Sequence, residues 1–137
     1  MRRLLLLGIS LCLLAGSAFA QDPVKVDPKH YTVVFENDRV RVLKIHYGAH
    51  EKSVMHSHPD AVATFLVDEH AKFTLPDGTS PVRDGKAGDA VWTPAETHLP
   101  ENLSDKSLDG ILVELKGKST ARTSKKAAAP APKKEGS

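Results

Sequence analysis

The chain between residues 31 and 116 alternates short apolar or β-branched segments with polar turns, and this pattern predicts an all-β fold. The predicted strands are 31–35, 39–47, 56–59, 61–67, 71–75, 90–93, 98–103 and 111–115. A Pro76-Asp77-Gly78-Thr79 turn is typical of a hairpin, and a phase shift at Val42-Leu43 indicates a bulge or a strand buried on both faces. Because no long stretch has helical period, a single-domain sandwich or barrel is favoured.

The two ends of the chain differ in composition from this body. Residues 1–20 begin with Arg2-Arg3, continue with a short apolar run and end in Ala18-Phe19-Ala20, which predicts a signal peptide cleaved after Ala20 and a secreted or periplasmic protein. Cleavage would remove the only cysteine and leave no transmembrane segment. Residues 21–30 are expected to form an N-terminal arm. Residues 117–137, rich in Ala, Pro and Lys, are expected to form a disordered basic tail.

The charge is divided between the body and the tail. Residues 21–116 contain 11 Lys and Arg against 16 Asp and Glu, whereas residues 117–137 contain 6 against 1. The basic charge therefore lies outside the predicted folded body and lacks aromatic partners. This distribution argues against a nucleic-acid-binding function.

Three histidines provide the candidate chemistry. His56 and His58 are separated by one residue, so on a β-strand their side chains point to the same face. A partner strand carrying His98 would bring a third imidazole to that face. Three imidazoles with an open coordination position are typical of a catalytic metal site.

The order of these pieces resembles the cupin superfamily, in particular its small single-domain, cupin 2-like members. Gly48 precedes His56-Ser57-His58-Pro59 as in the first cupin motif, and Gly88, Pro94, His98 and Asn102 follow the order of the second. The resemblance covers residues 31–116 and implies a jelly-roll barrel, also called a double-stranded β-helix. It also implies a small-molecule ligand in the barrel and allows a homodimer.

The chain departs from the cupin pattern at the acidic ligand. The glutamate of the first motif would fall at Val62 or Ala63, and both are apolar. Glu96 is the first substitute, either as a fourth ligand or as a general base, and Asp60 is a weaker one. Without its usual carboxylate, the site is predicted to be a three-histidine centre of His56, His58 and His98.

Two functions are compatible with this site. In the first, a divalent metal held by His56, His58 and His98 (iron, manganese, zinc, copper or nickel) supports an oxidoreductase or isomerase acting on a small oxygenated substrate. In the second, the barrel is a non-catalytic module that binds a small ligand or a metal, or a metal-free descendant in which the histidines only line a polar pocket.

Other polar and aromatic residues are expected to have structural or surface roles. Trp92 and Phe65 are predicted to be core or pocket wall, and Asn102 a structural hydrogen-bonding residue. The histidines outside the motifs are predicted to lie on the surface or in loops, with His50 alone within reach of the site: His30, His46, His50 and His70.

Overall fold

The computed structural model describes residues 21–117, which form nine β-strands and one short helix. The elements are α1 (Pro23–Val26), β1 (Tyr31–Glu36), β2 (Val40–Tyr47), β3 (His56–His58), β4 (Ala61–Phe65), β5 (Glu69–Thr74), β6 (Val82–Gly85), β7 (Ala90–Thr93), β8 (Glu96–Asn102) and β9 (Leu108–Leu115). The expected signal peptide, and the expected tail apart from Gly117, lie outside the described residues. No helix within the described part is long and apolar enough to traverse a bilayer.

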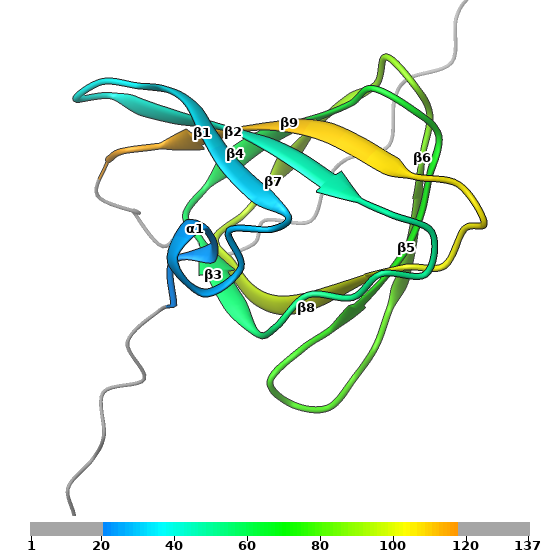
Figure 1. Cartoon of the computed structure of the whole chain (residues 1–137). Coiled ribbons are helices and arrows are strands. Elements are labelled where there is room, and N and C mark those ends of the chain that lie inside the picture. The colour runs from blue at the N-terminus through cyan, green and yellow to red at the C-terminus, as the bar shows by residue number, and fades with distance from the viewer. Residues whose placement is uncertain (1–20, 118–137) are drawn as a thin grey trace, which may run out of the picture.

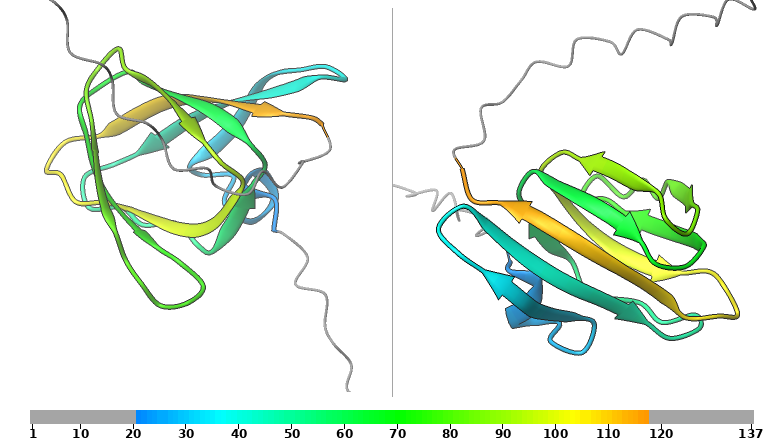
Figure 2. Two further views of the ribbon diagram at one scale, coloured as in Figure 1. Left: turned by 180° about the vertical axis from the view of Figure 1, so that it is seen from behind. Right: turned by 90° about the horizontal axis from the view of Figure 1, so that it is seen from above.

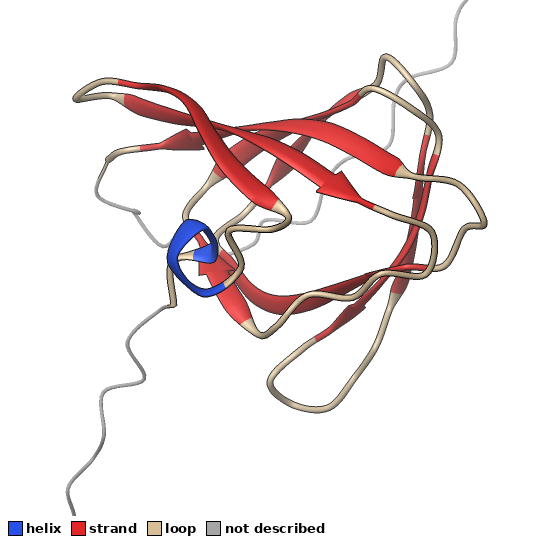
Figure 3. Ribbon diagram, in the orientation of Figure 1, coloured by secondary structure: helices blue, strands red, loops and turns tan. Residues whose placement is uncertain are grey.

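The strands form two antiparallel sheets that curve around a common interior (Figure 1). One sheet has the order β1-β2-β9-β4-β7 and the other the order β3-β8-β5-β6. Figure 2 shows β9, in orange, between β2 and β4, strands that lie far from it in the sequence. Figure 3 shows that α1 is a single short turn beside an otherwise all-strand body. The predicted all-β jelly-roll barrel is confirmed.

Strand β2 carries the longest uninterrupted pairing, with β9, from Val40↔Leu115 to Tyr47↔Leu108. On its other side β2 pairs with β1, and the register shifts between Val33 and Phe35. The predicted irregularity at this place is therefore a bulge, and it lies in β1 rather than in β2. A bulge adds a residue to one strand and increases its local twist.

The buried apolar core is small. It consists of Tyr31, Leu43, Tyr47, Ala61, Ala71, Leu108 and Leu112. The Tyr47 hydroxyl donates a hydrogen bond to the Tyr31 hydroxyl over 2.7 Å, which satisfies two polar groups inside the barrel. The rest of the interior is a cavity of about 380 Å³, so the barrel is hollow enough to take a small ligand.

The residues before β1 close one end of the barrel. Asp22 caps α1 by accepting a hydrogen bond from the Val24 backbone amide over 3.0 Å, and Pro23 occupies the first turn. The Gln21 carbonyl accepts a hydrogen bond from the Ser57 amide over 2.9 Å. This segment therefore covers β3, which is an edge strand of its sheet.

Two elements were not predicted. Strand β6 has the polar sequence Val-Arg-Asp-Gly and lies at a sheet edge, so it lacks the apolar alternation that marks a strand. Helix α1 is a single turn, below the length at which helical periodicity can be read.

Candidate metal centre

The three predicted histidines lie together inside the barrel. In the β3–β8 ladder His56 is directly opposite His98, and His58 points to the same side two residues further on. The ring centroids are 4.8 Å apart for His56 and His58, 5.2 Å for His56 and His98, and 5.3 Å for His58 and His98. One ring nitrogen from each lies within 4.8 Å of the others. The cluster is therefore close enough to bind a metal.

Each imidazole is held through its Nδ1 atom. The acceptors are the Val54 carbonyl for His56 (2.8 Å), Glu114 Oε1 for His58 (2.7 Å) and Glu96 Oε1 for His98 (2.7 Å). An Nδ1–H donor fixes the tautomer in which Nε2 is a free lone-pair acceptor. The three Nε2 atoms are thus the ones available to a ligand.

The Nε2 atom of His56 is fully buried and has no hydrogen-bond partner among the described residues. An unpaired buried polar atom is costly, so the lone pair of this atom is available to a ligand. Burial, reinforced by the neighbouring His58, lowers the pKa of His56 to about 4. Burial also lowers the pKa of His98 to about 4, despite its hydrogen bond to Glu96. Both rings are neutral at pH 7, the form that binds metals.

Glu114 is the main residue that the sequence did not reveal. Its side chain is 1% exposed, and besides His58 it contacts Arg41, whose Nε donates to Glu114 Oε2 over 2.6 Å. Burial raises the pKa of Glu114, but the hydrogen bonds from His58 and Arg41 outweigh this, and the pKa lies below its usual range. Arg41 also donates to Asp22 Oδ2 over 2.8 Å. The result is a chain of hydrogen bonds from His58 and Glu114, which are buried, through Arg41 to Asp22, which are half-buried.

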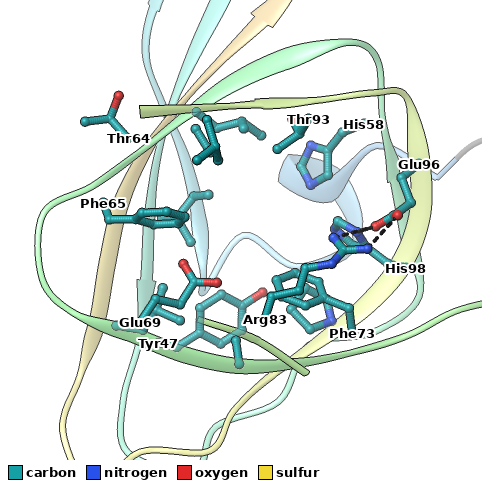
Figure 4. A pocket seen from close by; sticks show the side chains of 18 of the residues that line it. Tyr47, His58, Thr64, Phe65, Glu69, Phe73, Arg83, Thr93, Glu96 and His98 are labelled. Atoms are coloured by element: carbon teal, nitrogen blue, oxygen red, sulfur yellow. Dashed lines mark hydrogen bonds and ion pairs between the residues drawn. The ribbon is translucent and has the colours of Figure 1, made fainter. Parts of the chain in front are cut away.

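Glu96 holds His98 in the same way. It receives two hydrogen bonds from Arg83, at 3.0 and 2.8 Å, in addition to the one from His98 Nδ1 (Figure 4). Burial raises the pKa of Glu96, but the hydrogen bonds from Arg83 and His98 outweigh this effect, and the pKa lies below its usual range. The carboxylate is therefore ionised. Glu96 therefore lies behind His98, on the side away from Nε2. Asp60, the weaker substitute, accepts a hydrogen bond from the Ala95 amide over 2.8 Å and so braces the loop before β8.

His30 lies in the turn before β1, which agrees with the prediction of a surface or loop position, but it is buried rather than on the surface. This histidine is 5% exposed, stacks on Tyr47 with a centroid distance of 4.2 Å, and hydrogen-bonds through Nδ1 to Asp27. Asp27 also accepts a hydrogen bond from Ser53, whose Oγ lies 3.3 Å from His56 Nδ1. His30 is buried because the N-terminal arm folds over β3, an arrangement that no local sequence pattern shows.

The remaining predictions about single residues mostly agree with the structure. His46, His50 and His70 are exposed, and His50 pairs with Asp105 instead of reaching the cluster. Asn102 is buried and donates to the carbonyls of Gly48 and Lys106, which is a structural role. Trp92 and Phe65 line the cavity as expected, although Trp92 is 56% exposed.

The cavity opens onto the cluster. His58 and His98 line it at one side, and Phe65, Tyr47 and Glu69 line it at the other (Figure 4). Its walls are mostly apolar, and the aromatic ring of Phe73 lies beneath the Arg83 guanidinium, 4.5 Å from it. A ligand in this cavity would touch two of the histidines at one end and Glu69 at the other.

Glu69 gives the first testable prediction. Burial raises its pKa from 4.5 to about 7, with Arg83 lowering it and Asp84 raising it further. Because the folded protein holds this proton up to a higher pH than the unfolded chain does, stability is greatest below 4.5 and falls as the pH rises through 7. We expect ionisation of Glu69 to cost about 3 kcal/mol at pH 8.

Glu69→Gln removes this titration and is expected to raise the free energy of unfolding at pH 8 by that amount, with little change at pH 4.5. Urea unfolding at the two pH values measures both effects. Equal gains at the two pH values, or no gain at pH 8, would contradict the assignment.

Comparisons with known proteins find the same architecture among solved structures. No protein-family model and no curated protein sequence matches the chain. Among solved structures, a cupin domain from Bordetella pertussis Tohama I matches with a TM-score of 0.60 and 24% identity, over 64% of this chain and 92% of that one. A protein from Klebsiella pneumoniae with a double-stranded β-helix domain matches with a TM-score of 0.52 and 23% identity, over 65% of this chain and 77% of that one. The polyketide cyclase RemF from Streptomyces resistomycificus matches with a TM-score of 0.50 and 15% identity, over 64% of each chain. At these identities the likeness concerns the fold alone.

Proposed function

Because this chain has the cupin fold, we propose that it binds one divalent metal ion through the Nε2 atoms of His56, His58 and His98. The observation that supports this most directly is the buried Nε2 of His56, which has no partner among the described residues and belongs to a ring clustered with those of His58 and His98. These three residues would hold the ion through their free ring nitrogens, since one ring nitrogen from each lies within 4.8 Å of the others. The cavity beside His58 and His98 leaves room for a ligand at the metal.

The groups that accept hydrogen bonds from the three histidine Nδ1 atoms fit a metal-binding role. Metal-binding histidines usually donate their other N–H to a carboxylate or a carbonyl, and all three do so here. Both carboxylates are themselves paired with an arginine, Glu114 with Arg41 and Glu96 with Arg83. They can therefore hold the imidazoles without becoming ligands. Glu96 would have to leave both Arg83 and His98 to serve as a fourth ligand or a base, so we assign it the positioning of His98.

We further propose that the metal site acts on a small oxygenated molecule, in a reaction of the dioxygenase or isomerase type. A bound metal would polarise an oxygen of that molecule or activate dioxygen. The protein's own contribution is to exclude water with the apolar cavity wall and to fix the orientation of the imidazoles. Three imidazole ligands suit iron(II), zinc, copper, nickel or manganese. The predicted signal peptide would place this activity outside the cytoplasm.

Metal content tests the proposal. Protein purified without a histidine tag and loaded with iron(II) or zinc is expected to retain about one equivalent after gel filtration, measured by atomic emission. His98→Ala is expected to lose it. His70→Ala is the matched control, because His70 is an exposed histidine that pairs with Asp84 on the outside of β5. A wild-type protein that stays metal-free and gains no stability from either ion would refute the proposal.

A second measurement separates an enzyme from a binding module. If the metal-loaded protein consumes dioxygen or converts small hydroxylated or keto substrates, and His98→Ala does not, the site is catalytic. Stoichiometric metal without turnover of any substrate would support the non-catalytic alternative, a small-ligand or metal-binding cupin.

A further inference from the structure

Glu69 occupies the end of the cavity away from the histidines. Side chains alternate along β5, so Glu69, Ala71 and Phe73 face inward, whereas His70 faces outward and pairs with Asp84. Figure 4 shows the Glu69 carboxylate directed into the cavity, beside Phe65 and Tyr47. The metal proposal gives this residue no role.

The Glu69 carboxylate has neither a hydrogen bond nor an ion pair with any residue of the described part of the chain. The nearest cation on the neighbouring strand, Arg83, is engaged by Glu96 through two hydrogen bonds. Burial raises the pKa of Glu69 to about 7, as expected for a carboxyl group partly removed from water, although the charge of Arg83 lowers it. The protein thus maintains a costly carboxylate inside its cavity, and such groups are commonly functional.

Aromatic rings enclose the carboxylate. Glu69 pairs with Gly85 across the β5–β6 ladder, and the Phe65 ring packs directly on Gly85. A Cβ atom at Gly85 would overlap that ring, so the glycine leaves Phe65 the space it needs beside Glu69. Tyr47 lies on the other side, and its hydroxyl is engaged with Tyr31. A carboxylate among aromatic faces is the arrangement that binds organic ammonium groups.

The charges around the cavity favour the same kind of ligand. The residues that line it include four acidic residues and a single arginine: Glu69, Asp84, Glu96, Glu101 and Arg83. Three of the acidic residues have a basic partner, since Asp84 pairs with the outward-facing His70, Glu96 with Arg83 and Glu101 with Lys72. Among these four, Glu69 alone has no ion-pair partner in the described part of the chain. An anionic ligand would be repelled here, and a neutral apolar one would leave the carboxylate without a partner.

We propose that this cavity binds a small organic cation, with its ammonium-type charge on Glu69 and its carbon atoms against Phe65 and Tyr47, and with an oxygen directed toward the histidines. The placing of the oxygen rests on the proposed metal function. The cation subsite itself is formed by Glu69 and the aromatic rings and does not require the metal.

Choline and its neutral isostere 3,3-dimethylbutan-1-ol provide the test, because they share one shape and one hydroxyl and differ only in charge. Both are titrated at millimolar concentrations into metal-free and zinc-loaded protein at pH 8 and followed by NMR. We expect choline to bind at least about tenfold more tightly than the alcohol in both forms. Glu69→Gln is expected to abolish this preference, and Glu36→Gln, a surface change at a residue that pairs with Lys116, is expected to keep it.

The outcomes separate the two proposals. A choline preference in the metal-free protein that disappears in Glu69→Gln supports the cation subsite even if no metal binds. Equal binding of the two probes, binding of neither, or a preference that persists in Glu69→Gln would overturn it even if the metal site is real. Circular dichroism would check that the variant is folded, and folding is not expected to suffer because Glu69→Gln removes a half-buried ionisable group.

Discussion

Glu114→Gln is expected to lower the free energy of unfolding by about 3 kcal/mol or more, the cost of removing one partner from a buried ion pair. The variant leaves Arg41 with Asp22 as its remaining carboxylate partner and weakens the hydrogen bond that His58 Nδ1 donates. For the same reason, metal affinity is expected to fall about 10- to 100-fold, the usual effect of losing a carboxylate that orients a metal-binding histidine. Chemical denaturation gives the first quantity and competition with a metal chelator the second.

Glu36→Gln is the matched control, since Glu36 forms an exposed ion pair with Lys116 that should contribute little to stability. A double-mutant cycle with Arg41→Met tests the pairing itself: once Arg41 is replaced, Glu114→Gln should cost less stability than it does in the native protein. If Glu114→Gln is as mild as Glu36→Gln in both assays, the chain of hydrogen bonds does not support the cluster.

His56→Leu is expected to separate stability from metal binding. In the metal-free protein this change removes a buried unpaired nitrogen, and we expect stability to stay level or rise by about 1 kcal/mol. In the native protein, metal at a thousand times its dissociation constant should add about 4 kcal/mol of stability, and the variant should gain none. Thermal unfolding with and without zinc measures both effects.

His70→Leu again provides the comparison, because it changes the same residue type on the exposed face of β5 and should keep the full metal-dependent gain. If His56→Leu still gains stability from zinc, the ion is bound elsewhere. A large loss of stability in the metal-free variant would instead mean that the hydrogen bond from His56 Nδ1 to the Val54 carbonyl matters more than the unpaired Nε2.

The histidine cluster could be predicted from sequence because its geometry is local. The period of two places His56 and His58 on one face, and a single strand pairing is enough to add His98. The two cupin-like motifs made that pairing a specific expectation. Strand order and register, in contrast, depend on contacts between distant segments. These contacts determine which carboxylates accept hydrogen bonds from the histidine Nδ1 atoms.

Glu114 illustrates that limit. The sequence pattern directed the search for a carboxylate to Val62 or Ala63 on β4, but the acidic group near His58 comes from β9, at the position paired with Ala61. Nothing in the apolar sequence around Glu114 distinguishes it from a solvent-facing residue of a strand. Glu69 was overlooked for a different reason: the predicted strand began at residue 71, whereas β5 begins at Glu69 and so places this residue on the same face as Ala71 and Phe73.

The chain of contacts that begins at Asp22 connects the start of the folded body to its chemistry. Asp22 holds Arg41, Arg41 holds Glu114, and Glu114 holds His58, while the neighbouring Gln21 carbonyl completes the edge of β3. If the signal peptide is removed after Ala20 as predicted, these are the first two residues of the mature protein. Proteolytic trimming by only two further residues would then act at a distance on the imidazole of His58, so the site of processing becomes a determinant of how well the centre is organised.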